Sequence, residues 1–153
     1  MNYDVWGSWS SGVGPNAPLD DSCAPAGDQG GSAVSAVKAW SNAGFPPHQI
    51  ILGVASYGHS FHVNKSSALD AWGNIVLYAP FNNSQQPVGD AWDTADGNDV
   101  CGIPKVFGGI QDFWGLITAG FLTKYGTPAI GIHYTFDECS KTVCVLQKLR
   151  SKN

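Results

Sequence analysis

The pattern of hydrophobic and polar positions predicts two strands in the first 61 residues of the chain. Residues 1–6 combine aromatic and polar side chains and stop at Gly7, which is typical of a strand that ends in a loop. Residues 50–55 form an almost continuous apolar run, which is typical of a parallel strand buried on both faces.

A helix is predicted between these two strands. Ser32 suits the N-cap position, and an apolar stripe follows it at helical spacing, formed by Ala33, Val34, Val37 and Trp40. Gly44 and the Pro46-Pro47 pair end the helix. Strand, helix and strand in this order predict a right-handed crossover of a parallel sheet, which fits an open sheet and a barrel equally well.

Residues 62–142 have shorter apolar runs and more Pro, Asn, Gly and Asp, which predicts a small α+β lobe. The expected elements are a strand over 74–79, a helix over 111–125 and a strand over 129–136. On the helix, Phe113, Ile117 and Phe121 share one face, and Gly126 is the expected C-cap.

Composition narrows the classes of function. The chain has 153 residues, 43% of them hydrophobic and 13% charged, which suits a folded domain with a core. The net charge of −4 comes without a basic stripe, so nucleic acid is not an expected partner. No apolar run approaches the length of a membrane span, so a membrane is not expected either.

The N-terminal stretch carries the candidate chemistry. Tyr3 has a hydroxyl that can donate to a substrate carbonyl, and Asp4 has a carboxylate that can accept from hydroxyls. Trp9 offers a flat apolar face on which a sugar ring can stack. An edge strand with a capping aspartate explains the same residues without any function.

Three blocks of sequence resemble the family 18 glycoside hydrolases, the chitinases, and particularly their secreted fungal members. These blocks are Met1-Asn2-Tyr3-Asp4 with Gly7-Ser8-Trp9, then Gly14-Pro15-Asn16-Ala17-Pro18-Leu19, and finally Ile50-Ile51-Leu52-Gly53-Val54-Ala55-Ser56-Tyr57-Gly58-His59-Ser60-Phe61. The first and third resemble the sixth and seventh strands of that family's barrel. Their order and spacing cover roughly residues 1–142.

The resemblance implies an α/β fold built from a partial (β/α)8 TIM barrel and an insertion lobe. Residues 1–61 would supply strands six and seven with their connecting helix, and residues 62–142 the α+β insertion domain. Residues 143–153 depart from the family and form an off-pattern tail, of the kind that read-through into an intron produces. Met1 begins directly on a strand without a signal peptide, so we expect a C-terminal fragment of a secreted or extracellular parent.

The resemblance also implies retaining hydrolysis of β-1,4-linked N-acetylglucosamine chains in which the substrate's acetamido oxygen is the nucleophile. Tyr3 would hold that acetamido group, and Asp4 would bond the sugar near the scissile linkage. Trp9 and Tyr57 would line the substrate cleft. No cofactor or metal is implied. Many members carry Arg where this chain has His59, so no sugar contact is assigned to it.

The family's acidic motif, Asp-x-x-Asp-x-Asp-x-Glu, does not occur in this sequence. The aspartates that recur every three residues are Asp90, Asp93, Asp96 and Asp99, but Asn98 and Val100 stand where the pattern needs acids. They also lack EF-hand spacing, so a solvated acidic loop is expected. Without the general-acid Glu, the lone chain is expected to be inactive. A chitin-binding, lectin-like protein and a truncated product without function remain alternatives.

Cysteines and glycosylation sequons bear on the compartment. Four cysteines, Cys23, Cys101, Cys139 and Cys144, allow three pairings. We expect Cys101 and Cys139 to pair within the lobe and Cys144 to stay unpaired. The sequons Asn64-Lys65-Ser66 and Asn82-Asn83-Ser84 also indicate secretion. Zinc is not expected, because the cysteine and histidine pairs lack finger spacing.

Overall fold

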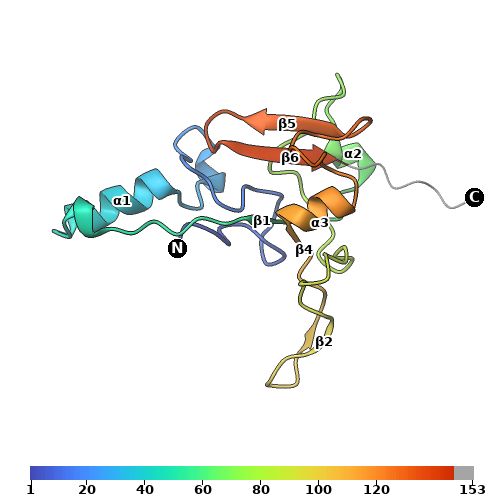
Figure 1. Cartoon of the computed structure of the whole chain (residues 1–153), viewed down its shortest axis with the longest axis horizontal. Helices are drawn as coiled ribbons and strands as arrows, with labels where there is room; N and C mark the ends of the chain where they lie inside the picture. Colours follow the sequence, from blue (N-terminus) through green and yellow to red (C-terminus); the bar gives the residue numbers. More distant parts are fainter. Residues whose placement is uncertain (147–153) are drawn as a thin grey trace, which may run out of the picture.

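The computed structural model describes residues 1–146 and contains three two-stranded antiparallel sheets, three α-helices and two 3₁₀ turns (Figure 1). The sheets pair β1 (Tyr57–His59) with β4 (Ile110–Asp112), β2 (Gly97–Asn98) with β3 (Pro104–Lys105), and β5 (His133–Asp137) with β6 (Thr142–Leu146). The helices are α1 (Ala33–Asn42), α2 (Lys65–Ala68) and α3 (Phe113–Thr118), and the turns are η1 (Ala26–Asp28) and η2 (Pro47–Gln49).

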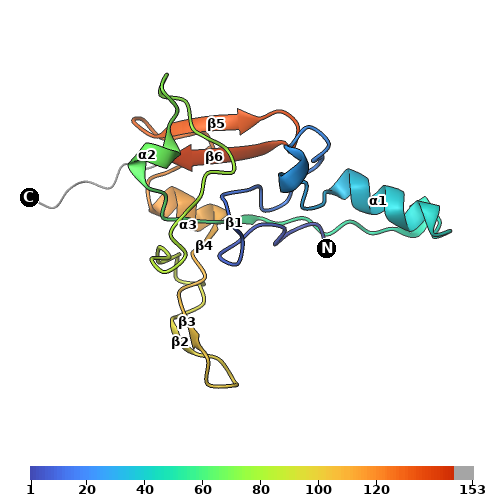
Figure 2. The same ribbon diagram turned by 180° about the vertical axis from the view of Figure 1, so that it is seen from behind.

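Helix α1 confirms the helix predicted from the apolar stripe. Ser32 caps it, because its hydroxyl accepts from the Ser35 N–H at 3.2 Å while the Ser35 hydroxyl accepts from the Ser32 N–H at 2.8 Å. The stripe is largely uncovered, since only Ala33 is buried and Trp40 is 59% exposed. In both ribbon views α1 forms an arm that points away from the β5–β6 hairpin (Figures 1 and 2).

The two strands predicted at 1–6 and 50–55 are not regular strands in the structure. One backbone bond joins them, from the Asn2 N–H to the Gly53 carbonyl at 3.0 Å, and no parallel ladder forms within residues 1–146. Ile51 is 93% exposed and Val54 74% exposed, although burial on both faces was expected. A single backbone bond is not a ladder, and a strand buried on both faces needs paired partners at its edges. The regular strands of the predicted partial barrel are therefore not confirmed.

The helix predicted over 111–125 is also wrong in its bounds. Residues 110–112 form β4 instead, and α3 starts after Asp112, whose carboxylate accepts from the Gly115 N–H. The helix ends at Thr118, and its C-cap Ala119 is followed by Gly120, which has a φ of 81°. The Gly120 N–H bonds the Ile117 carbonyl at 3.0 Å and the Phe121 N–H bonds the Leu116 carbonyl at 2.9 Å, a Schellman ending. Gly126 lies in a later turn.

The C-terminal hairpin differs from the expectation in the bounds of its strands. The strand predicted over 129–136 begins at His133, and its partner β6 crosses the boundary expected at residue 142. The strand predicted over 74–79 is reduced to one isolated bridge between Leu69 and Ile75. The remainder of the expected tail, residues 147–153, lies outside the described residues.

A small core surrounds Trp6, which is 8% exposed and packs against Tyr78 with ring centroids 5.4 Å apart.

A disulfide joins Cys23 to Cys139, so the predicted Cys101–Cys139 pair is wrong. Cys101 is an exposed free thiol in the loop between β2 and β3, which projects from the rest of the chain (Figure 2). Near the disulfide, the Leu19 N–H bonds the Ser140 carbonyl at 2.9 Å, which holds the segments of Cys23 and Cys139 together. Cys144 is free, as expected.

Candidate functional site

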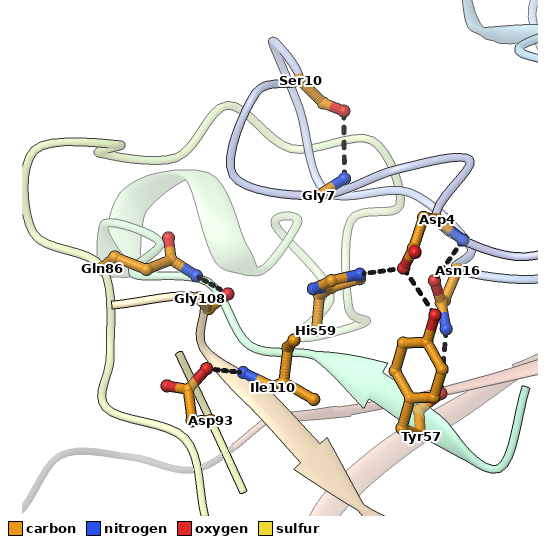
Figure 3. A network of polar contacts seen from close by, with 10 residues as sticks. All are labelled: Asp4, Gly7, Ser10, Asn16, Tyr57, His59, Gln86, Asp93, Gly108 and Ile110. Atoms are coloured by element: carbon orange, nitrogen blue, oxygen red, sulfur yellow. Dashed lines mark hydrogen bonds and ion pairs between the residues drawn. The ribbon is translucent and has the colours of Figure 1, made fainter. Parts of the chain in front are cut away.

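The carboxylate of Asp4 is the centre of the candidate site (Figure 3). Its Oδ1 accepts a hydrogen bond from the Tyr57 hydroxyl at 2.7 Å and lies 3.0 Å from Nε2 of His59. The side chain of Asp4 is 45% exposed, whereas that of His59 is 5% exposed. One oxygen is thus held by two aromatic side chains while the carboxylate stays open to solvent.

Strand β1 positions both partners of Asp4. Tyr57 and His59 are two residues apart on this strand, so their side chains project from the same face. Pairing of β1 with β4 fixes the strand, with Tyr57 opposite Asp112 and His59 opposite Ile110. Asp4 itself lies on the N-terminal segment and has a φ of 56°, an unusual conformation for a residue with a Cβ.

Asn16 connects the segment of Asp4 to that of Tyr57. Its Oδ1 accepts from the Asp4 N–H at 2.9 Å, and its Nδ2 donates to the Tyr57 carbonyl at 2.9 Å. Its own carbonyl accepts from the Val5 N–H at 3.1 Å. One amide side chain therefore joins residues 53 positions apart in sequence and stabilises the left-handed backbone of Asp4.

Asp93 supports β4 from the other side. Its carboxylate accepts from three backbone N–H groups, those of Gly89 at 2.7 Å, Gly109 at 3.0 Å and Ile110 at 3.1 Å. Figure 3 shows the bond to Ile110. The solvated acidic loop expected here is therefore wrong for Asp93, because its carboxylate replaces water as the acceptor for a loop that has few other partners. Among residues 1–146, no group of three His, Cys, Asp or Glu side chains is placed to hold a metal ion.

Charge at the site is set by burial and hydrogen bonding. Partial burial raises the pKa of Asp4, but the hydrogen bonds from Tyr57 and His59 and the charge of His59 outweigh it and hold that pKa below its usual value. Burial, together with the hydrogen bond to Asp4 and its negative charge, raises the pKa of Tyr57 well above its usual value. At neutral pH, Asp4 is an acceptor and Tyr57 is a donor.

Three aromatic residues selected from sequence, Tyr3, Trp9 and Tyr57, form a row with His59 beside Asp4. Ring centroids are 6.2 Å apart for Tyr3 and Tyr57, 5.9 Å for Tyr57 and His59, and 5.6 Å for His59 and Trp9, each pair edge to face. Trp9 ends the row and is 63% exposed. The structure thus brings together Tyr3, Asp4, Trp9 and Tyr57, and the direct bond to Asp4 comes from Tyr57.

Sequence reasoning missed His59 and Asn16. The position of His59 two residues after Tyr57 is a signal for a shared strand face, but nothing in the sequence indicates the partners of Asn16. A cavity of about 700 Å³ lies beside the disulfide, lined in part by Asp20, Asp137 and Glu138. None of the predicted site residues lines it, and the candidate site is instead marked by exposed side chains, with Trp9 63% and Asp4 45% exposed.

Three comparisons relate this chain to known proteins. The sequence model described as "Glycosyl hydrolases family 18" matches residues 1–135. A chitinase-like effector of Moniliophthora roreri is 52% identical over 144 residues, which are 93% of this chain and 35% of the relative. The chain thus spans about a third of the length of that relative.

Solved structures give the same relationship. A chitinase from Rhizomucor miehei superposes with a TM-score of 0.74 at 31% identity, covering 95% of this chain and 37% of that one. YKL-39, whose structures were solved in the presence of chitooligosaccharides, superposes with a TM-score of 0.62 at 17% identity, covering 97% of this chain and 33% of that one. This last likeness concerns the fold alone.

Proposed function

The chain belongs to family 18 of the glycosyl hydrolases, and on that premise we propose that it binds chitooligosaccharides at the Asp4 site without hydrolysing them. In this proposal residues 1–61 are a piece of the family's barrel and residues 62–142 its insertion lobe. The name "chitinase-like effector" of the Moniliophthora roreri relative fits a non-catalytic role. The disulfide and that relative also support a secreted origin.

The observation that carries the proposal is the clamp on Asp4 beside an exposed indole. Because Tyr57 and His59 hold one oxygen, the rest of the carboxylate can accept from sugar hydroxyls in a fixed orientation. Trp9 offers its exposed face for stacking on a sugar ring. Tyr3 forms no side-chain hydrogen bond within the described residues, so its hydroxyl is free to donate to an acetamido carbonyl.

Among the described residues, the chain lacks a glutamate that is placed to act as the general acid. The sequence contains a single one, Glu138, in the turn between β5 and β6. It is exposed and forms an ion pair with Lys141 at 2.8 Å, so its surroundings do not suit it to act as a general acid. A general acid contributes typically about 10²–10⁴-fold to such a reaction. A substrate whose acetamido group is positioned by Tyr3 would still lack a proton donor for its leaving group.

Titration of the 153-residue chain with chitotetraose, followed by tryptophan fluorescence and calorimetry, tests the proposal. An open site buries little of a sugar chain, so we expect millimolar affinity, on the order of −4 kcal/mol. Trp9→Ala should abolish binding, whereas Trp72→Ala, at an 86% exposed indole in another loop, should leave it unchanged. Cellotetraose, which lacks the acetamido group, should bind more weakly.

Two outcomes would overturn the proposal. Turnover of fluorogenic chitotriose above background, lost in Asp4→Ala, would make the lone chain an enzyme. No binding, together with poorly dispersed amide resonances in an NMR spectrum, would favour a product without independent function.

A further inference from the structure

Two glycosylation sequons follow β1 in the chain, and their surroundings in the structure differ. The first is Asn64-Lys65-Ser66 and the second is Asn82-Asn83-Ser84. From their different surroundings we propose that Asn64 is a site of N-linked glycosylation and that Asn82 is left unmodified. This inference is independent of sugar binding at Asp4.

Asn64 presents an amide that the fold does not use. The residue is exposed and stands at the N-cap of α2, yet its side chain makes no capping hydrogen bond. Its backbone carbonyl accepts the first helical bonds, from the Ser67 N–H at 2.9 Å and the Ala68 N–H at 3.0 Å. A glycan on Nδ2 therefore removes no bond of the folded chain, although an N-cap asparagine usually contributes one.

Asn82 is bonded within its own sequon through its side-chain oxygen. Its Oδ1 accepts from the Ser84 hydroxyl at 2.7 Å and from the Ser84 N–H at 3.1 Å. Its own N–H donates to the His62 carbonyl at 2.9 Å, and Gln86, four residues on, is buried. A glycosyltransferase must recognise both the asparagine amide and the serine hydroxyl of a sequon. Here the amide oxygen and the hydroxyl are bonded to one another in a local turn. Because such bonds join near neighbours, they form early in the chain.

The compartment required for this modification is consistent with the covalent structure. The Cys23–Cys139 disulfide spans 116 residues, and disulfides of this kind persist in oxidising compartments such as the secretory pathway. The same pathway supplies the oligosaccharide donor. Bulky glycans are accepted at exposed positions, which matches Asn64 and not the half-buried Asn82.

The transfer is a substitution without oxidation or reduction. Nδ2 of Asn64 attacks the anomeric carbon of an oligosaccharide carried on a polyprenyl pyrophosphate. The new bond joins that carbon to Nδ2, and the bond from the carbon to the pyrophosphate oxygen breaks. The pyrophosphate leaves with the electron pair, and the amide loses one proton to the transferase.

Expression of the full chain behind a secretion signal in a eukaryotic host tests the assignment. We expect one glycan, which peptide N-glycosidase removes with conversion of Asn64 to Asp, as localised by peptide mass spectrometry. Asn64→Gln should remove the glycan, and Asn82→Gln should leave it unchanged. Ser66→Ala, which keeps Asn64 but destroys its sequon, should also remove it, whereas Ser66→Thr should retain it.

Formation of the Cys23–Cys139 bridge reports that the chain entered the oxidising compartment. A bridged chain without any glycan would overturn the proposal. A glycan found on Asn82 in amounts equal to Asn64, or on Asn82 alone, would overturn it as well. Glycan transfer occurs during translocation, so a variant that is retained in the cell still reports occupancy.

Discussion

At the scale of single residues, Asp4 shows how a carboxylate is prepared as an acceptor. Tyr57 and His59 both bind Oδ1, while Asn16 holds the backbone of Asp4 at a φ of 56°. Residue chemistry pointed to Tyr3 and Asp4 as a pair because they are adjacent in sequence. Asp4 has a left-handed backbone, however, and the tyrosine whose hydroxyl reaches its carboxylate comes from 53 positions away.

Removal of the Tyr57 hydroxyl should raise the pKa of Asp4. In the folded chain this pKa is depressed, so the clamp stabilises the fold fully above the ordinary carboxyl pKa of about 3.9 and is lost as the pH falls through the lower folded value. In Tyr57→Phe the Asp4 titration, followed by carboxyl ¹³C NMR, should move to higher pH. Tyr125→Phe, at an 80% exposed ring, is the control. An unmoved Asp4 midpoint would contradict the clamp.

Asn16→Ala should separate the two segments that form the site. It removes the acceptor for the Asp4 N–H and the donor to the Tyr57 carbonyl, each worth roughly 1 kcal/mol. We expect a rise in the Asp4 pKa and a several-fold loss of chitotetraose affinity. Asn83→Ala, at an exposed asparagine, should change neither. A variant that loses stability but keeps the wild-type Asp4 titration would make Asn16 merely structural.

At the scale of elements, the helix that depends on local sequence signals was predicted well, whereas the strands depended on neighbouring segments that the sequence does not reveal. Helix α1 followed from Ser32 and the apolar stripe, because a cap and a period are properties of the segment itself. The strands at 1–6 and 50–55 failed because strand formation depends on partners elsewhere in the chain. Helix α3 ended early because Gly120, and not Gly126, takes the left-handed position of the Schellman motif.

Asp93 supports the site indirectly. Its carboxylate binds the backbone at the start of β4, and β4 pairs with β1, which carries Tyr57 and His59. Asp93→Ala should leave three backbone N–H groups without their acceptor, at a cost of about 1–3 kcal/mol. We expect faster amide exchange at residues 57–59 and 109–112. Asp96→Ala, at an exposed aspartate of the same loop, is the matched control. Equal exchange in the two variants would show that β1 does not depend on Asp93.

At the scale of the whole molecule, the first 61 residues leave large apolar side chains uncovered. Met1, Trp40, Ile51 and Val54 are each more than half exposed. A closed barrel would bury such residues, but closure requires eight strands that cover one another's edges. The sequence therefore shows that residues 50–55 are apolar, but it could not predict what surrounds them. Within residues 1–146, no helix is long and apolar enough to cross a membrane.

The Cys23–Cys139 bridge is the strongest long-range constraint on a chain with so small a core. It spans 116 residues, and the chain-entropy model gives about 4–5 kcal/mol for closing a loop of that length. That is comparable with the whole stability of a small domain, so Cys23→Ser should lower the unfolding midpoint strongly, as followed by circular dichroism. Cys101→Ser should leave it unchanged, because Cys101 is exposed and free.

Peptide mapping of the non-reduced chain gives a direct check on the same bridge. Cys101 should be alkylated quickly by iodoacetamide and Cys144 slowly, because burial raises the pKa of the Cys144 thiol and lowers its thiolate fraction. Cys23 and Cys139 should react only after reduction. A dominant Cys101–Cys139 peptide would restore the pairing expected from the sequence, and would mean that the β2–β3 loop folds back onto the β5–β6 turn instead of projecting from it.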